Sequence, residues 1–234
     1  IYQLTRAFRD DEQGSIHNPE FTILEWYRCG DSMEQAMDLL DELSQQLLDA
    51  KPARRITYQQ AFQQCLNFDP LTGSTSALLK LIASLEFQPP DNWRTMDRDG
   101  WLHLLLAEFI EPWLSDQPTI LYDYPASQAA LAIIRQDDPP VAERFELYVN
   151  GVELANGYHE LLDAGELRRR NEEVNQLRIQ DGRPGLPVES HLLEAMQSGI
   201  ADCSGVALGV DRLVMLASGV TDIQQVIAFP FERA

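Results

Sequence analysis

The sequence is short of basic residues, and this shortage limits the partners that the protein can have. It contains 18 lysine and arginine residues against 37 aspartate and glutamate residues, a formal net charge of -19. Such a chain repels a polyanion unless its basic residues gather on one face. The only cluster is Arg168 to Arg170, and the simpler interpretation places it on the solvated face of a helix. Extended nucleic-acid binding is therefore not expected, and tRNA is not an expected partner.

Cysteines and long apolar runs are also scarce. The three cysteines, Cys29, Cys65 and Cys203, are widely spaced, with no CxxC pair and no histidine at metal-ligand spacing. This pattern supports neither a disulfide framework nor a zinc site and is typical of a protein from a reducing cytosol. Without a membrane-length apolar run or a signal-peptide pattern, a soluble, cytoplasmic protein with no membrane partner is expected.

What the chain does contain is enough apolar material for a core. Hydrophobic residues make up 44% of its 234 residues, including four Trp and nine Phe, which allows one large domain or two small ones. The sequence opens on Ile1, inside a strand-like pattern and without an initiator methionine. We therefore expect it to be a segment of a longer protein.

The first 28 residues predict a β-hairpin with a long, charged loop. Segments 1–8 and 21–27 are rich in β-branched and aromatic residues, and turn-forming residues lie between them. The loop carries these ionisable or polar side chains: Arg9, Asp10, Asp11, Glu12, His17, Asn18 and Glu20. An arginine offers a rigid fork to a phosphate, and Phe21 can stack on a base. The residues alone leave two interpretations open, a nucleotide site and a solvated charged hairpin.

The remaining pattern predicts helices at 32–49, 101–113, 166–180 and 189–197 and strands at 119–122 and 141–149. Ser32 with Gln35 and Thr57 with Gln60 form capping boxes, and Pro112 is expected to end its helix. Residues 51–118 read as short helices joined by loops, with a break at 88–90, and are interpreted as an insertion within one domain.

Two later segments carry candidate chemistry. Asn150-Gly151 predicts a hairpin turn that places Glu146 and Glu153 on its two arms. Facing carboxylates repel, so they either bind a cation such as magnesium or point into solvent. In Ser204 to Leu213 a small-residue strand runs into a helix at Gly209, from which Arg212 can reach a polyphosphate. A structural strand and helix is the alternative.

These motifs resemble the class II lysyl-tRNA synthetase family. Phe8-Arg9, His17 to Thr22 and Glu25-Trp26-Tyr27 resemble its motif 2, ELANGYHEL at 153–161 its acidic strand, and the segment at 204–213 its motif 3. The resemblance runs from Ile1 to the C-terminus, although 51–118 adds little. It implies an α+β fold, the class II catalytic domain with an antiparallel β-sheet flanked by helices. Motif 1, a main part of the family's homodimer interface, would precede Ile1.

The resemblance also implies roles for individual residues. Arg9 would hold the α-phosphate of ATP, His17 and Arg212 the γ-phosphate, and Phe21 the adenine, so Arg9 and Arg212 would be the catalytic residues. Three further sets follow by position: Asp11, Glu12, Asn18, Glu146 and Gly209 for ATP; Glu146 and Glu153 for Mg2+; Glu25, Tyr27, Asn156, Tyr158, Glu160 and Ala207 for the amino acid. The family's reaction joins an amino acid to AMP as an acyl adenylate and passes the acyl group to an acceptor.

Three departures point to one branch of this family. Asp11 stands where glutamate is usual, Ala207 where the synthetases have glycine, and PASQAAL at 125–131 replaces their serine-proline-leucine pattern. These variants resemble the paralogous ligases that attach (R)-β-lysine to a lysine of elongation factor P. The methyl group of Ala207 gives a reason, because it can exclude α-lysine and still admit an isomer whose amine lies one carbon further along. A true lysyl-tRNA synthetase core and a non-catalytic module that binds ATP or an amino acid remain as alternatives.

Overall fold

The computed structural model describes residues 1–10, 12–87, 89, 93 and 96–233. Asp11, one of the predicted ATP residues, and most of the predicted break at 88–90 lie outside these residues. Within the described part, eight strands form one sheet in the order β1-β2-β8-β7-β6-β4-β3, with β5 paired to β6. All pairings are antiparallel except that of β3 with β4. The predicted α+β class is confirmed.

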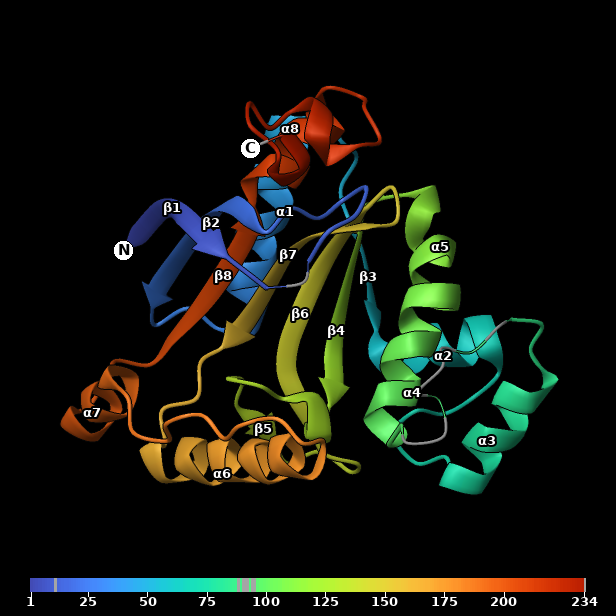
Figure 1. Ribbon diagram of the computed structural model, residues 1–234, viewed down its shortest axis with the longest axis vertical. Coiled ribbons are helices and arrows are strands. Elements are labelled where there is room, and N and C mark those ends of the chain that lie inside the picture. The colour runs from blue at the N-terminus through green and yellow to red at the C-terminus, as the bar shows by residue number, and fades with distance from the viewer. Residues whose placement is uncertain (11, 88, 90–92, 94–95, 234) are drawn as a thin grey trace.

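The strands that carry the predicted motifs are neighbours in this sheet. Their bounds are β1 Tyr2–Phe8, β2 Glu20–Cys29, β6 Val141–Val149, β7 Val152–His159 and β8 Cys203–Gly209. Motif 2 forms the predicted hairpin of β1 and β2, and β8 then lies between β2 and β7. Segments from the two ends of the chain are thus brought side by side (Figure 1).

Helix α1 (Met33–Leu48) and α8 (Val210–Ala217) cover one face of the sheet, which we call the back face (Figure 1). The predicted capping box is present, with Ser32 Oγ accepting from the Gln35 N–H and the Gln35 side chain accepting from the Ser32 N–H. Met37 and Leu40 of α1 are buried against Phe145 and Val206 of the sheet. Burial of this apolar stripe is what fixes α1 on the back face.

The opposite, front face is covered over β4 (Thr119–Pro125) and β6 by the segment between α1 and β4. Its helices are α2 (Tyr58–Leu66), α3 (Thr75–Ser84), α4 (Arg98–Leu105) and α5 (Glu111–Trp113), which stand beside the end of the sheet that β4 and β3 form in Figure 1. Tyr124 and Tyr148 from the strands are buried with Phe62 and Leu102 from the helices. The front face over β2, β8 and β7 is left for the cavity described below.

Two features of this segment differ from the sequence pattern. Arg54–Thr57 form a strand, β3, which pairs with β4 in parallel, whereas only helices and loops were predicted there. Pro112 does not end its helix, because a π-helical turn at Leu106–Ile110 precedes it and α5 continues to Trp113. In that turn the Glu111 N–H donates to the Leu106 carbonyl five residues earlier. The wider turn leads the chain into the proline, which lacks the N–H that an ordinary helix would need.

The second predicted hairpin, β6 with β7, turns at Asn150 and Gly151, which have φ values of 53 and 76 degrees. Both residue types tolerate this left-handed conformation. The short strand β5 (Ile134–Arg135) and helices α6 (Ala164–Gln180) and α7 (His191–Ser198) lie near the other end of the strands (Figure 1). No described helix is both long and apolar enough to cross a membrane.

Candidate active site

A cavity opens on the front face between the β1–β2 loop, β7 and the junction of β8 with α8. Predicted ATP residues at its walls are Arg9, Glu12, His17, Asn18, Phe21 and Arg212. Predicted residues at its floor and far end are Glu153, Asn156, Tyr158, Ala207 and Gly209. The fold therefore brings together residues that are far apart along the chain.

Arg212 ties three segments together at one end of the cavity. Its Nη1 donates to the Glu153 carbonyl at 2.7 Å, its Nε to the Ile16 carbonyl at 3.2 Å, and its Nη2 to His17 Nε2 at 2.7 Å. Burial, and then the charge of Arg212, lowers the pKa of His17, so its ring is neutral at pH 7 and can accept this bond. A fixed guanidinium beside a neutral imidazole is an arrangement that suits a polyphosphate.

Arg9 lies at the same end but is much more exposed. Its guanidinium stands 5.3 Å over the centre of the Phe21 ring, and its Nη1 is 3.4 Å from Glu12 Oε1. A base that stacks on Phe21 requires Arg9 to leave the ring. This movement costs little for an exposed cation–π pair, about 0.5–1 kcal/mol.

Asn18 has a structural position in the loop. Its Nδ2 donates to the Glu20 carbonyl at 2.6 Å, and its Oδ1 accepts from the Phe231 N–H at 3.0 Å. The Ile223 N–H also donates to the Ser15 carbonyl. The C-terminal segment and Asn18 thus hold the loop that carries His17, one of the predicted ATP residues.

Most of the residues predicted to bind the amino acid lie in two rows of facing side chains across β2, β8, β7 and β6, which we call the amino-acid end. In the first row Glu25 pairs with Ala207, Ala207 with Asn156, and Asn156 with Glu146. In the second row Tyr27 pairs with Gly205, Gly205 with Tyr158, and Tyr158 with Arg144. Residues directly opposite one another in antiparallel strands point to the same face. Acidic and phenolic groups therefore surround Ala207 and Gly205.

Gly205 was not among the predicted site residues, although it belongs to the motif 3 segment. A Cβ atom there would lie 2.6 Å from Tyr27 Cδ1 and closer still to Glu160 Oε1. Burial, and then the charges of Glu25 and Glu160, raises the pKa of Tyr27 to about 12. Glu160 and Tyr27 occupy the place where any larger residue would carry its side chain.

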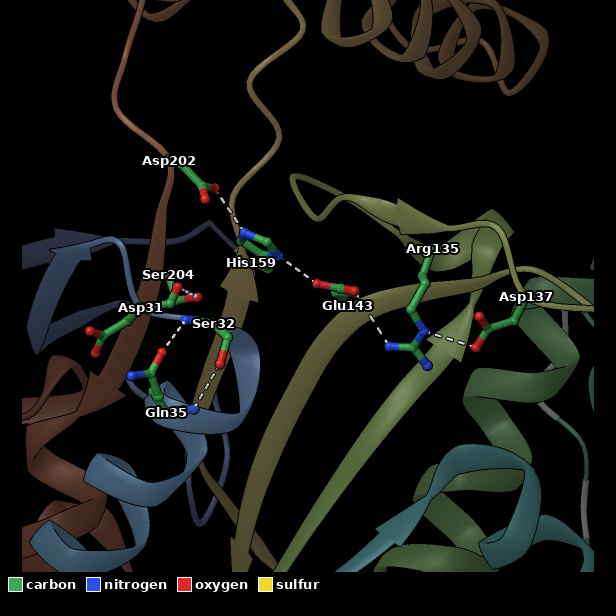
Figure 2. Close-up of polar contacts among 9 residues, drawn as sticks. All are labelled: Asp31, Ser32, Gln35, Arg135, Asp137, Glu143, His159, Asp202 and Ser204. Atoms are coloured by element: carbon green, nitrogen blue, oxygen red, sulfur yellow. Dashed lines mark hydrogen bonds and ion pairs between the residues drawn. The ribbon is translucent and has the colours of Figure 1, made fainter.

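The Glu160 carboxyl changes between its protonated and ionised forms near neutral pH. Burial raises its pKa to about 7, His159 opposes this shift and Glu25 adds to it. His159 is held between two carboxylates, with Nδ1 2.5 Å from Glu143 and Nε2 2.9 Å from Asp202, and Glu143 also contacts Arg135 (Figure 2). Although burial favours the neutral ring, these hydrogen bonds raise the pKa of His159. The protonated form of His159, one residue from Glu160, is thus favoured by its carboxylate partners.

Glu146 is surrounded by donors instead of facing the cavity. The Tyr124 and Tyr148 hydroxyls each donate to its Oε2 at 2.5 Å. Arg144 Nη2 and Asn156 Nδ2 donate to its Oε1 at 2.5 Å and 3.0 Å. Its residue is only 4% exposed. Magnesium shared by Glu146 and Glu153 stays a prediction, and it requires Glu146 to release donors.

A third carboxylate, Glu111 at the start of α5, belongs to this neighbourhood and was missed by the sequence analysis. Burial, and then the charge of Glu146, raises the pKa of Glu111 to about 7 and also raises that of Glu153. The described residues contain no cluster of three or more His, Cys, Asp or Glu side chains arranged to hold a metal. Glu153, beside Arg212 Nη1 at 3.8 Å, is the predicted ligand that lines the cavity.

Other groups that shape the site also escaped the sequence analysis. Arg144, Tyr124 and Tyr148 surround Glu146, and His159 adjoins Glu160. His159 lies in the quoted segment ELANGYHEL and was the only one of the four with a local signal. The others are recognised only from the pairing of β6 with β4 and β7.

Comparison with known proteins agrees with this geometry. The model of class II tRNA synthetases (D, K and N) matches residues 1–233. The elongation factor P–(R)-β-lysine ligases of Salmonella arizonae and Salmonella gallinarum are each 49% identical to this chain over 235 aligned residues. These alignments cover 100% of the chain and 72% of each relative. The ligase of Salmonella paratyphi B is 48% identical with the same coverage. The chain belongs to the family of class II tRNA synthetases (D, K and N).

Proposed function

We propose that this protein is a ligase that activates (R)-β-lysine with ATP and transfers it to a lysine side chain of elongation factor P. The observation that carries the proposal is the match of 49% identity over the whole chain to ligases named for that reaction. The cavity supports it, because Arg9 and Arg212 line it together with Ala207. The carboxylate of Glu25 belongs to the residue opposite Ala207 on β2, and Glu160 lies over the neighbouring Gly205. Such an arrangement suits ATP at one end and a diamino acid at the other.

In the proposed first step the substrate carboxylate attacks the α-phosphorus of ATP in line. A new oxygen–phosphorus bond forms, pyrophosphate leaves, and an acyl adenylate remains. No side-chain nucleophile is required, so positioning and charge neutralisation supply the catalysis. Arg9 would neutralise the α-phosphate, while Arg212 and neutral His17 would bind the terminal phosphate.

The amino-acid end would recognise ammonium groups. Glu25 and Glu160 supply negative charge, and Asn156 supplies a buried carbonyl oxygen, Oδ1, that has no hydrogen-bond partner among the described residues. A buried acceptor without a partner is costly, and a substrate N–H would satisfy it. Ala207, which faces both Glu25 and Asn156, would select the isomer whose amine avoids its methyl group.

Magnesium fits the site through Glu153. Burial, and then the charges of Glu146 and Glu111, raises the pKa of this carboxyl at the cavity wall, and a bound cation would favour its ionised form. One carboxylate together with substrate phosphates is a usual way for proteins to bind magnesium. When bound, the ion would neutralise charge on the polyphosphate. Glu146 would join it only after exchanging the donors that it holds.

In the proposed second step the amine of an acceptor lysine attacks the carbonyl carbon of the adenylate. An amide bond forms and AMP leaves, while the proton of the attacking amine passes to solvent. Dimerisation and a cytoplasmic location stay predictions from the resemblance and the composition.

The test is the intact mass of two acceptors after incubation with the protein, ATP, magnesium and (R)-β-lysine. We expect elongation factor P to gain one lysyl unit and lysine tRNA to remain uncharged. Arg212→Ala is the matched inactive control, and elongation factor P without its acceptor lysine is the second control. Charging of tRNA with elongation factor P unchanged would overturn the proposal and assign the chain to tRNA aminoacylation.

A further inference from the structure

Cys29 and Cys203 face one another across β2 and β8. They are direct partners in the antiparallel register, so their side chains lie on the same face, in the row that follows Tyr27 and Gly205. Neither belongs to the ATP or amino-acid residues described above. A pairing of two thiols at this place cannot be read from their distant positions in the sequence.

The hydrogen-bond pattern shows which kind of pair they form. The Gly30 N–H donates to the Asp202 carbonyl at 2.8 Å, so the 30/202 pair is the hydrogen-bonded type. The types alternate along an antiparallel ladder, which makes Cys29 and Cys203 a non-hydrogen-bonded pair. The Glu160 N–H donates to the Cys203 carbonyl at 3.0 Å, as expected if Cys203 bonds to β7 and not to β2.

This type of pair has the separation that a disulfide requires. Opposite residues in a non-hydrogen-bonded pair have Cα atoms about 4.5 Å apart, inside the usual disulfide range of about 4.4–6.8 Å. The Ser204 hydroxyl also donates to the Asp31 carbonyl at 2.9 Å, which anchors β8 to the chain beyond β2 (Figure 2). The strand pairing and the Ser204 bond therefore hold the two thiols opposite each other.

The two thiols differ in access to solvent. Cys29 is exposed and Cys203 is buried, with 8% of its residue surface exposed. We propose that Cys29 and Cys203 are a redox-active pair that forms a disulfide between β2 and β8 when a small disulfide such as oxidised glutathione reaches Cys29. In a reducing cytosol such a bond is transient and has a regulatory role.

The exchange balances without any further reactant. The Cys29 thiolate attacks one sulfur of oxidised glutathione, forms a mixed disulfide and releases one glutathione thiolate. Cys203 then gives up its proton to solvent and attacks Cys29 Sγ, and the second glutathione leaves. The two cysteines lose two electrons and two protons, and oxidised glutathione is reduced to two glutathione molecules.

The bond would act on the amino-acid end of the site, a consequence that rests on the proposed function. Opposite Cβ atoms in a non-hydrogen-bonded pair stand about 4.5 Å apart, whereas a disulfide holds them near 3.8 Å, so the strands close by roughly 0.7 Å at this row. Tyr27 and Glu160 fill the space over Gly205 in the next row, so a movement of these strands would shift both side chains. A misplacement of that size costs up to ~100-fold, and we expect about a tenfold rise in the KM for the amino acid with little change for ATP.

The first measurement does not depend on activity. The native protein is treated with oxidised glutathione, alkylated under denaturing conditions without reductant, and analysed by intact mass and peptide mapping. We expect a linked Cys29–Cys203 peptide, the mass of two hydrogen atoms lost, and Cys65 as the alkylated thiol. A stable glutathione adduct on Cys29, or alkylation of all three cysteines, would overturn the proposal.

Two variants complete the test. Cys65→Ser is the matched control and should still form the linked peptide, whereas Cys29→Ser should not form it and should keep its KM after oxidation. Activity is measured by ATP–pyrophosphate exchange with (R)-β-lysine before and after treatment. An unchanged KM in a protein shown by mass to be linked would overturn the regulatory part. Absence of exchange in the reduced protein would instead refute the proposed function and leave the disulfide result intact.

Discussion

Asn156 donates its side-chain amide to Glu146, with 3.0 Å between Asn156 Nδ2 and Glu146 Oε1. This bond fixes the orientation of Asn156 and leaves its Oδ1 as a buried acceptor with no partner among the described residues. Glu146 thus orients a residue of the proposed amino-acid site, and its own charge is balanced by Arg144 at 2.5 Å. The contacts of Glu146 indicate that it supports its neighbours. A direct role in magnesium binding would require it to give up these contacts.

Glu146→Gln tests these two roles. The variant leaves Arg144 buried without its counter-charge, so we expect a loss of roughly 3 kcal/mol in the free energy of unfolding, measured by urea denaturation. Tyr124→Phe, which removes one donor only, is the control and should lose about 1 kcal/mol. Full stability of Glu146→Gln, together with a higher magnesium requirement, would favour a direct metal role.

Gly205→Ala should disrupt the amino-acid end selectively. The added methyl group would overlap Tyr27 and Glu160, and both must move. We expect the KM for (R)-β-lysine in ATP–pyrophosphate exchange to rise by about 10–100-fold, with the KM for ATP nearly unchanged. Gly185→Ala, where the nearest atom would be 3.7 Å away, is the matched control. An equal loss for both substrates would indicate misfolding instead.

Ala207→Gly should relax the choice between isomers. Removing the methyl group that stands between Glu25 and Asn156 gives α-lysine room at the pocket floor. One methyl group is worth about 10–200-fold in discrimination, so we expect the kcat/KM ratio of α-lysine to β-lysine to rise by at least about tenfold. Ala217→Gly, at the exposed end of α8, serves as the control. A ratio that does not change would remove Ala207 from the account of specificity.

Amino-acid binding should improve as pH rises through about 7, because the pKa of Glu160 is raised to about 7 and its ionised form attracts an ammonium group. Well below its pKa, the ionised fraction of Glu160 falls about tenfold for each pH unit. The KM for the amino acid should rise towards pH 6 as that fraction falls. Glu160→Gln should flatten the profile. His159→Gln should move its midpoint to higher pH, because the charge of His159 lowers the pKa of Glu160.

The raised pKa of Glu160 also affects the free energy of unfolding, and this contribution decreases as pH rises, whereas amino-acid binding improves. A carboxyl whose pKa is higher in the folded protein than in the unfolded chain favours folding when protonated. The contribution of Glu160 is therefore largest below its ordinary value of 4.5 and is lost as pH rises to about 7. Thermal unfolding of the ligand-free protein should show this trend, and Glu160→Gln should weaken it.

Local signals gave reliable predictions where neighbouring residues decide the conformation. The Ser32 capping box and the left-handed Asn150-Gly151 turn depend on side chains within three residues of each other, and both are present. The β1–β2 hairpin and the α+β class were also predicted and are confirmed. Pro112 was misjudged because its local rule assumes an ordinary helix before the proline.

By itself, the sequence determined the family motifs, the two predicted hairpins and the acidic composition of the protein. Only the tertiary structure decided which residues face each other: Glu146 with Asn156, Gly205 beneath Glu160 and Tyr27, and Cys29 opposite Cys203. The physical reason is the two-residue period of a strand, since a register shift of one residue turns every side chain to the other face. Register between distant strands is set by the burial of the whole sheet between its helices, and no short segment encodes it.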